Sequence, residues 1–221
     1  MINTKPLTVV FCLPGETFST QFLQNWTQLI MELPRYNIQP RVSPAESSNV
    51  YFVRSKCLGG DVLLGVEQKP FRGEPYDYIM WIDSDSYFRP ELFFQLLSHK
   101  ADIVSGYYMM QGERNFAVVK DWDEEVFRTN GSFEFMTVES MAKEKELFEV
   151  AYAGMGFMLV KRGVFESLDY PWFAPVFHDM GGGVRDFSSE DVSFCLRARE
   201  KGFRVFVDPT VRVGHEKRIV I

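Results

Sequence analysis

Two carboxylates with one residue between them, Asp83 and Asp85, follow a run of large apolar residues at positions 78–82. A continuous apolar run rich in β-branched and aromatic side chains predicts a strand buried on both faces of a sheet. In open α/β sheets, ligands bind outside the carboxyl ends of the strands. Carboxylates there suit Mg²⁺ or Mn²⁺, which keep open positions for phosphate oxygens. The alternative is a plain turn, because Asp and Ser are both common in turns.

A second pair of carboxylates, Glu190 and Asp191, opens a predicted helix that runs to Lys201 and stops at Gly202. A carboxylate within hydrogen-bond reach of a hydroxyl group can act as a general base. The alternative is structural. Ser188 and Asp191 have the spacing of a capping box, and the helix dipole favours acidic residues in a first turn. Helix signals alone favour this structural interpretation.

Basic side chains and one imidazole follow two other predicted strands. Arg54 and Lys56 follow a predicted strand at 49–53. An Arg there could offer its bidentate fork to phosphate oxygens, and ordinary surface charge is the alternative. His215 and Lys217 follow a late short strand, and a lone His by itself indicates no ligand site.

Glycines mark two further segments. Gly154 and Gly156 interrupt a predicted strand at 150–160. Glycines inside a strand pattern indicate close approach of a ligand or of another backbone, and a bulge or tight packing remains equally open. The segment 171–187 contains three consecutive glycines and is either a mobile lid over a site or an ordinary loop.

Strands and helices are predicted to alternate along most of the chain. Strands are expected at 7–13, 49–53, 78–82, 102–108, 150–160, 203–207 and 211–213. Helices are expected at 18–33, 90–100 and 188–201, with shorter ones at 58–66 and 137–148 and a turn-rich segment at 37–48. Alternation of this kind predicts an α/β fold with a mainly parallel central sheet flanked by helices. The length of 221 residues allows one large domain of this type.

The amino-acid composition limits the classes of protein and of partner that are compatible with this sequence. Hydrophobic residues make up 46% and charged residues 24%, as in ordinary soluble globular proteins. A net charge of −6 argues against nucleic acid as a partner, because that partner calls for a basic face. The cysteines, Cys12, Cys57 and Cys195, lie in apolar contexts without metal-ligand spacing and predict buried free thiols. Because the sequence shows neither a signal peptide nor an apolar run of transmembrane length, we expect a cytoplasmic protein or a domain of a longer chain.

Four local patterns, taken in order, resemble those of nucleotide-sugar-dependent glycosyltransferases of the GT-A fold. Residues 78–85 resemble the strand that ends in the family's Asp-x-Asp metal motif. Residues 154–162 resemble its glycine-containing strand along the sugar site, and residues 189–197 its Glu-Asp helix start beside the acceptor. Residues 213–215 resemble the late histidine that completes the metal site. The resemblance spans roughly residues 7–218, and the chain's size is similar to that of small soluble bacterial or viral members.

The resemblance implies a single glycosyltransferase domain over residues 1–221. Residues 1–110 would form its nucleotide- and metal-binding half, and residues 111–221 its acceptor and sugar half. The implied partners are a UDP-sugar donor and a carbohydrate or glycoconjugate acceptor carrying the hydroxyl that is glycosylated. The implied cofactor is Mn²⁺ or Mg²⁺, which bridges the donor's diphosphate and acts as a Lewis acid.

The resemblance also implies a role for each candidate residue. The metal ligands would be Asp83, Asp85 and His215. The donor would also be bordered by Pro14, Gly15, Arg54, Ser84, Gly154, Gly156 and Lys217. Asp191 would be the general base of an inverting reaction, and Glu190 would bind hydroxyls of the acceptor or donor. A retaining outcome stays open, because it depends on geometry.

Two other functions compete with this hypothesis. A nucleotidyltransferase that makes nucleotide-sugars shares the layout and the metal chemistry, but usually has a basic, Gly-rich loop after its first strand. Here that loop, residues 14–17, is short and carries no cation. A non-catalytic carbohydrate- or nucleotide-binding domain is the other alternative, although a pure binder would not need both carboxylate pairs.

Overall fold

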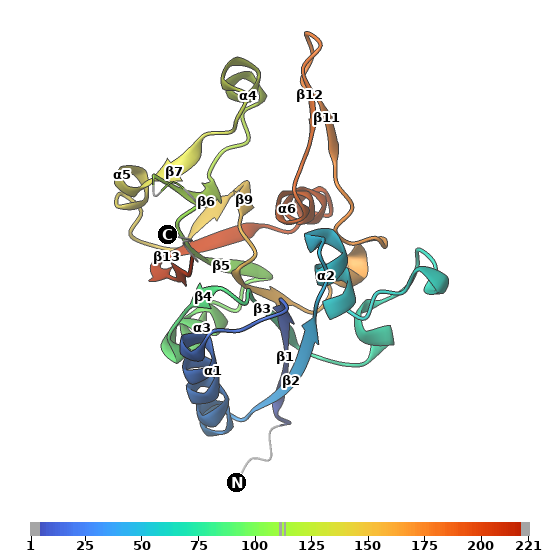
Figure 1. Cartoon of the computed structure of the whole chain (residues 1–221), viewed down its shortest axis with the longest axis vertical. Coiled ribbons are helices and arrows are strands. Elements are labelled where there is room, and N and C mark those ends of the chain that lie inside the picture. Colours follow the sequence, from blue (N-terminus) through green and yellow to red (C-terminus); the bar gives the residue numbers. More distant parts are fainter. Residues whose placement is uncertain (1–4, 111, 113, 218–221) are drawn as a thin grey trace.

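The centre of the molecule is a mixed β-sheet with the strand order β2-β1-β3-β10-β5-β13-β8 (Figure 1). The structure is a computed structural model that describes residues 5–110, 112 and 114–217. The strands are β1 (Leu7–Pro14), β2 (Ile38–Ala45), β3 (Tyr78–Ile82), β5 (Ile103–Tyr107), β8 (Phe148–Val150), β10 (Phe157–Lys161) and β13 (Val205–Arg212). Their pairings give β2, β1, β3, β5 and β13 one direction and β10 and β8 the opposite one. The predicted α/β fold with a mainly parallel central sheet flanked by helices is therefore confirmed.

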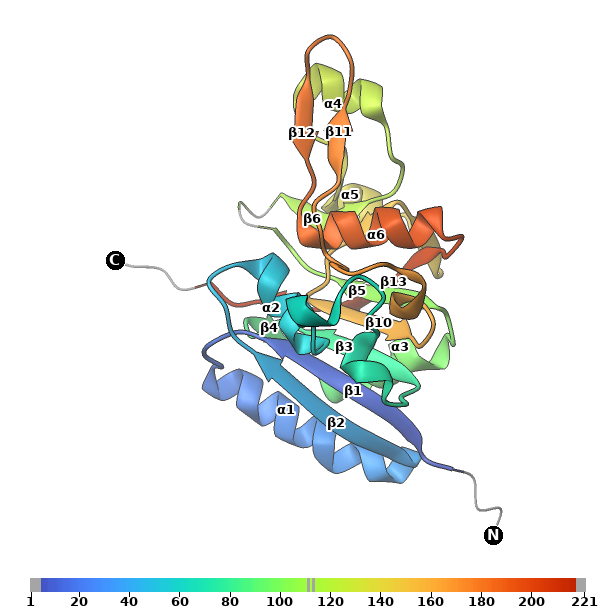
Figure 2. The same ribbon diagram turned by 90° about the vertical axis from the view of Figure 1, so that its right-hand side faces the viewer.

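Helices cover both faces of this sheet (Figure 2). Helices α1 (Thr20–Glu32) and α3 (Pro90–Ser98) pack on one face, where they meet side chains such as Phe11 and Met80. Helices α2 (Val50–Cys57) and α6 (Glu190–Glu200) cover the other face, where Cys12 and Trp81 point. Successive side chains of a strand point to opposite faces, so the apolar run 78–82 fills both cores at once.

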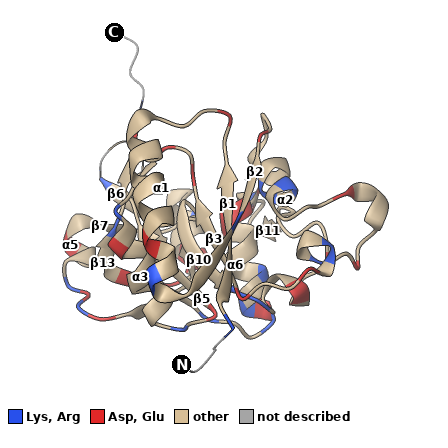
Figure 3. Ribbon diagram, turned by 90° about the horizontal axis from the view of Figure 1, so that it is seen from below, with Lys and Arg blue, Asp and Glu red and all other residues tan. Residues whose placement is uncertain are grey.

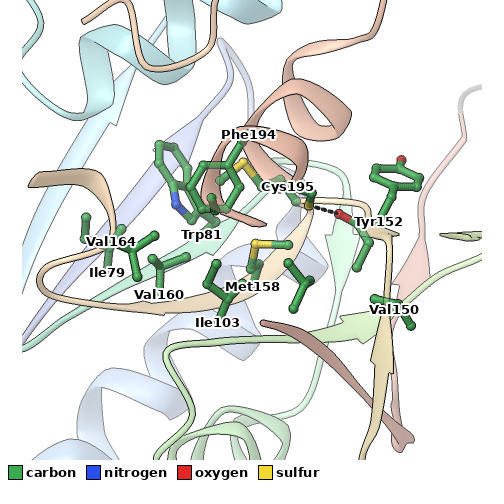
Figure 4. Packing of buried hydrophobic residues seen from close by; sticks show 14 of the residues in the cluster. Ile79, Trp81, Ile103, Val150, Tyr152, Met158, Val160, Val164, Phe194 and Cys195 are labelled. Carbon is green, nitrogen blue, oxygen red and sulfur yellow. Dashed lines mark hydrogen bonds between the residues drawn. The ribbon is translucent and has the colours of Figure 1, made fainter. Parts of the chain in front are cut away.

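The core beneath α6 holds large aromatic side chains together with cysteines and methionines (Figure 4). Trp81 from β3 and Phe194 from α6 are fully buried beside Met158. The Cys195 thiol donates a hydrogen bond to the Ala153 carbonyl at 3.6 Å. Cys12, Cys57 and Cys195 are all free and buried, as predicted. This packing fixes the position of α6, and with it the two carboxylates at the start of that helix.

Smaller sheets and short helices lie around the central sheet. Strand β4 (Ser86–Tyr87) pairs with β14 (Gly214–His215), and β6 (Asn115–Val119) pairs with β7 (Phe135–Thr137) and β9 (Tyr152–Ala153). Strands β11 (Phe177–Asp179) and β12 (Arg185–Phe187) form a hairpin. The short helices are α4 (Glu124–Asn130) and α5 (Val138–Met141), with 3₁₀ turns at Leu33–Tyr36, Val62–Leu64, Pro70–Gly73 and Phe165–Ser167.

Two adjoining predictions about the second strand were wrong. The predicted strand at 49–53 is the start of helix α2, whose first turn is capped by the Asn49 side chain accepting from the Tyr51 N–H. The segment 37–48, predicted as turns, contains β2. Strand β2 lies at the sheet edge and pairs only with β1 in the described part of the chain, and an edge strand tolerates proline. Arg54 and Lys56 therefore stand on a helix.

Other boundaries moved less. The helix predicted at 58–66 is only the 3₁₀ turn Val62–Leu64, and the one predicted at 137–148 ends at Met141. The strand predicted at 150–160 is divided between β9 and β10 around Gly154 and Gly156. The loop predicted at 171–187 contains the β11–β12 hairpin. The strands predicted at 203–207 and 211–213 are joined in the single strand β13, which ends at Arg212.

Charged residues of both signs are scattered along the ribbon seen in Figure 3. Within the described residues, no helix combines the length and the apolar character needed to cross a bilayer.

Asp208 stabilises the irregular part of β13, where the register with β5 shifts between Val207 and Arg212. Its side chain is buried. It accepts hydrogen bonds from the Thr210 N–H at 2.8 Å and from the Thr210 hydroxyl at 2.6 Å, and Nε2 of His99 lies 2.7 Å from its other oxygen. Burial would raise the pKa of Asp208, but the bonds from Thr210 and His99 outweigh it and hold the pKa below its ordinary value.

We expect Asp208→Asn to lower the free energy of unfolding at pH 7 by about 1–3 kcal/mol, the usual loss for charged hydrogen bonds. A carboxylate with a depressed folded-state pKa stabilises above its unfolded pKa of about 3.9, and that stabilisation disappears as pH falls through the folded value. Denaturant titrations of both proteins should therefore converge below about pH 4. The control is Asp179→Asn, which removes an exposed ion pair with Arg185 and should change stability little. An equal loss in both variants would contradict the prediction.

Candidate functional site

The Asp-Ser-Asp segment forms a turn at the carboxyl end of β3. The Asp83 N–H donates to the Gly156 carbonyl at 3.0 Å, and the Ser86 N–H donates to the Asp83 carbonyl at 2.9 Å. The buried Ser86 hydroxyl donates to the same Gly156 carbonyl at 3.0 Å. The turn predicted as the plain alternative is thus present. It directs both carboxylates to the sheet edge where ligands bind in α/β folds.

Asp85 and His215 contact each other across the β4–β14 pairing. Nε2 of His215 lies 2.8 Å from a carboxylate oxygen of Asp85, and Nδ1 lies 3.2 Å from the Met109 carbonyl oxygen. The hydrogen bond with Asp85 raises the pKa of His215. Burial would raise the pKa of Asp85, but His215 and Lys217 outweigh it and lower that pKa. Lys217 Nζ lies 2.7 Å from His215 Nε2 and 3.7 Å from the Asp85 carboxylate.

Arg54 joins the two carboxylate motifs. Its side chain is 3% exposed and lies over the Trp81 ring, with the guanidinium carbon 5.5 Å from the ring centroid. Two of its nitrogens donate to the two oxygens of Asp83 at 2.9 and 3.1 Å, and Nε donates to Glu190 at 2.9 Å. Burial would lower the pKa of Arg54, but Asp83 and Glu190 raise it further, so the guanidinium stays charged.

Glu190 is the buried member of its pair and Asp191 the more accessible one. Burial, together with the neighbouring Asp191 charge, raises the pKa of Glu190, and Arg54 opposes this rise. One Asp191 oxygen accepts from the Tyr152 hydroxyl at 2.9 Å, and the other accepts from the Ser189 hydroxyl and from the Val192 N–H. The Ser188 hydroxyl contacts the Val176 carbonyl and the Ser193 hydroxyl instead of the helix N–H groups, and the N-cap residue is Ser189, so the capping box of Ser188 and Asp191 is absent.

Two tyrosines that the sequence reasoning did not single out fill the space between these motifs. A Cβ added at Gly154 would overlap the Tyr108 hydroxyl, and one added at Gly156 would lie 2.9 Å from the Tyr108 ring. Tyr108 meets the His215 ring edge-on at 5.3 Å, and burial with the Asp83 and Asp191 charges raises its pKa. Tyr152 holds Asp191 in the same region. The position of Tyr108 directly after β5 was an available signal, whereas Tyr152 opens β9 and gave none.

The first loop adjoins the same turn. Strand β1 ends at Pro14, and the Gly15 N–H donates to the Ala45 carbonyl at 2.9 Å. Gly15 has φ of 148°, and a Cβ there would overlap the Ser84 hydroxyl. Only glycine combines this backbone conformation with so close an approach. Pro14, Gly15 and Ser84 therefore lie together, as their predicted common role requires.

The three predicted metal ligands line one small cavity. It has a volume of about 90 Å³ and is bounded by Asp83, Asp85, Ser86, Tyr108, Gly156, Gly214 and His215. Within the described residues, no three His, Cys, Asp or Glu side chains already form a metal-binding cluster. Both Asp83 oxygens accept hydrogen bonds from Arg54. The Asp85 oxygen and the His215 nitrogen lie 2.8 Å apart, a distance typical of two ligands of one metal ion. Octahedral ligands with bonds of roughly 2.1 Å are about 3 Å apart. Asp85 and His215 could hold a divalent cation in place of their mutual hydrogen bond, with Asp83 beside it.

The comparisons with known proteins assign this chain to no family. The sequence matches no protein-family model and no curated protein. A structure of GalNAc-T7 with UDP, GalNAc and Mn²⁺ is similar over 99% of this chain and 45% of its own, at 11% identity and a TM-score of 0.49. An inositol-1-phosphate CTP transferase from T. maritima covers 96% of this chain at 9% identity and a TM-score of 0.44, with 90% of its own length matched. Mannosyl-3-phosphoglycerate synthase from Rubrobacter xylanophilus covers 97% of this chain and 68% of its own, at 14% identity and a TM-score of 0.41.

Similarity at these TM-scores identifies neither a family nor an activity. The chain spans less than half the length of GalNAc-T7.

Proposed function

We propose that this protein is a metal-dependent glycosyltransferase that moves a sugar from a UDP-sugar to a hydroxyl group of a carbohydrate or glycoconjugate. The observation that carries the proposal is the convergence of two carboxylate motifs at one end of the sheet. Arg54 bonds both Asp83 and Glu190, and Tyr108 lies near both Asp83 and Asp191. A diphosphate site and a general base could therefore act on one bound donor.

The donor half of the site consists of the small cavity and the loops beside it. Asp85 and His215, with Asp83 next to them, would hold Mn²⁺ or Mg²⁺, which when bound supplies Lewis-acid stabilisation of the leaving diphosphate. Lys217 adds a positive charge beside these residues and would pair with a phosphate oxygen. Pro14, Gly15 and Ser84 border the nucleotide, and Gly154 and Gly156 leave room for Tyr108 beside the sugar.

Asp191 is suited to the base role because it is partly exposed and held in place by Tyr152. A carboxylate in this position would accept the proton of the acceptor hydroxyl as its oxygen attacks the anomeric carbon. The leaving UDP would carry away the electron pair of the broken glycosidic bond. Glu190 has a different part, because its contact with Arg54 holds it in the buried network. We therefore assign Glu190 to positioning rather than to proton transfer.

The metal–diphosphate site is tested by calorimetric titration of UDP into the wild type and Asp85→Ala, with Mn²⁺ and with EDTA. We expect Mn²⁺-dependent binding in the wild type and at least about tenfold weaker binding in the variant, because losing even an outer-shell group costs that much metal affinity. Asp102→Ala is the matched control. It removes an exposed carboxylate that pairs with Lys161 before β5 begins, at the opposite end of the sheet. Equal UDP binding with and without metal would refute the metal-dependent proposal.

The competing nucleotidyltransferase activity gives a different product. Incubation with a sugar 1-phosphate and UTP would yield pyrophosphate from a nucleotidyltransferase, whereas a glycosyltransferase releases UDP from UDP-sugars. The first loop carries Glu16 and no cation to neutralise a triphosphate, which favours the second outcome.

A further inference from the structure

An aromatic pocket lies outside the donor site, between the β11–β12 hairpin and the segment that joins α4 to β7. The hairpin and α4 project from the same side of the molecule, beyond α6 (Figures 1 and 2). The pocket has a volume of about 180 Å³. Its lining includes Phe133, Phe135, His178, Asp186, Phe187 and Ser189.

The pocket walls combine exposed ring faces with a few polar groups. Phe187 is 55% exposed, and Phe133 and Phe135 are partly exposed. Phe133 packs on Trp122 with 3.8 Å between the ring centroids and 33° between the ring planes, and this contact holds it in position. His178 is oriented by Nε2, which lies 3.2 Å from the Ser188 hydroxyl oxygen. Aromatic surface with a small number of placed polar groups is typical of ligand sites.

The pocket adjoins the proposed base. Ser189 and Val192, which line it, both bond Asp191: the Ser189 hydroxyl and the Val192 N–H donate to its carboxylate. Phe135 meets Tyr152 edge-on at 6.3 Å, and Tyr152 donates to the other Asp191 oxygen. Asp191 therefore lies next to this pocket.

The charges around the pocket disfavour an anionic occupant. Among the described lining residues there is an Asp and no Lys or Arg. Two cations on neighbouring elements are already engaged, Arg128 by the Met180 carbonyl at 2.6 Å and Arg185 by Asp179 at 3.0 Å. The segment 121–149 also has nine acidic residues against three basic ones. Asp186 and these acidic residues would weaken the binding of a phosphate or carboxylate here.

We propose that the aromatic pocket binds an uncharged pyranose ring of the acceptor, with the apolar face of the sugar on Phe187 and Phe133. The hydroxyls of that ring meet Asp186, His178 and Ser189, which supply the acceptors and donors that a sugar requires. The inference deepens the proposed function, because it names the acceptor class whose hydroxyl reaches Asp191. The pocket would place a neutral sugar beside Asp191.

The test uses methyl β-D-glucopyranoside and methyl β-D-glucuronide, which differ only at C6. Saturation-transfer NMR and competition titrations are run on the full chain, without nucleotide and again with UDP and Mn²⁺. We expect the neutral glycoside to bind and the glucuronide to bind at least about threefold more weakly, since one charge repulsion of this size is a fraction of a kcal/mol. Phe187→Ala should weaken binding of the neutral glycoside about three- to tenfold, the range for one ring contact.

Phe177→Ala is the matched control. Phe177 faces Phe187 across the hairpin and is 79% exposed, but it does not line the pocket. Loss of binding in Phe187→Ala with little change in Phe177→Ala supports the assignment. Equal losses in both variants, preference for the glucuronide, or no glycoside binding by the wild type in either condition would overturn it.

The two proposals fail separately. UDP binding that depends on Mn²⁺, without any glycoside binding, would leave the donor site in place and remove the acceptor pocket. Glycoside binding that Phe187→Ala weakens, without any UDP binding, would keep the pocket and remove the transferase.

Discussion

Asp191→Asn is expected to abolish most sugar transfer while UDP binding stays unchanged. Asn keeps the shape of Asp and can still accept from the Tyr152 hydroxyl, which lies 2.9 Å away in the wild type. It has no basic oxygen to take the acceptor proton, and loss of general-base catalysis costs about 10²- to 10⁴-fold in turnover. The measurement is UDP release from the UDP-sugar and methyl glycoside pair that gives the highest wild-type rate. Calorimetry of UDP with Mn²⁺ is made on the same preparation.

Tyr152→Phe provides the control for this substitution. It removes the hydroxyl that orients Asp191 but keeps the ring that packs in the core. We expect a turnover between those of the wild type and Asp191→Asn, because a base that is less well held remains a base. Wild-type turnover in Asp191→Asn would mean that another group takes the proton.

Arg54→Ala is expected to give the largest loss of stability among single substitutions at the site. The change leaves Asp83 and Glu190 facing each other without their shared cation, at a position where Arg54 was 3% exposed. Removing one partner of a buried ion pair costs about 3–5 kcal/mol, because the remaining charges stay buried without compensation. Chemical denaturation at pH 7 should show this loss in the free energy of unfolding. UDP binding should also weaken, since Asp83 loses the group that fixes both its oxygens.

Arg185→Ala is the control, because it tests whether loss of an exposed arginine ion pair lowers the free energy of unfolding as much as Arg54→Ala does. Its pair with Asp179 has side chains that are 77% and 58% exposed, and exposed pairs contribute about 0–1 kcal/mol. A loss below about 1 kcal/mol in Arg54→Ala would contradict the prediction, because the two carboxylates would then not depend on their shared cation.

The sequence was most informative where one pattern had one physical cause. The apolar run 78–82 has no polar position, so only a strand with both faces covered accommodates it. Helix α3 has Pro90 at its first turn and an apolar stripe, and these local signals agree with its packing. The same agreement held for α1 and α6, which are also long. The Ser19 side chain caps the N-terminal end of α1, and α6 begins directly after Ser189.

Local signals failed where the surroundings decided the structure. The β-branched and aromatic residues at 50–53 favour a strand, yet Asn49 caps a helix there and Arg54 is buried by its ion pairs. Pro40 and Pro44 favour turns, yet the strand they belong to has its free edge toward solvent. Both predictions failed because the structure there depends on contacts with residues far away along the chain. A local sequence pattern holds no information on such contacts.

The candidate site shows the same division. The types and spacing of Asp83, Asp85, Glu190 and Asp191 marked them as candidates, and the strand order explains why they lie near one another. The Arg54 network and the parts of Tyr108 and Tyr152 could not be predicted, because they depend on side-chain contacts across 29 to 136 positions of sequence. Their roles in catalysis remain predictions for the experiments above.

The position of β10 also governs the order in which the molecule can fold. Strand β10 comes from residues 157–161 but lies between β3 and β5, which end before residue 108. During synthesis, β3 and β5 therefore leave the ribosome long before the strand that joins them. Until then both expose unpaired edges, which are prone to pair with other chains. Asp83 gains its bond to Gly156 at the same late moment. Folding is thus expected to be slow, as in proteins with many long-range contacts, and to depend on protection of the early strands.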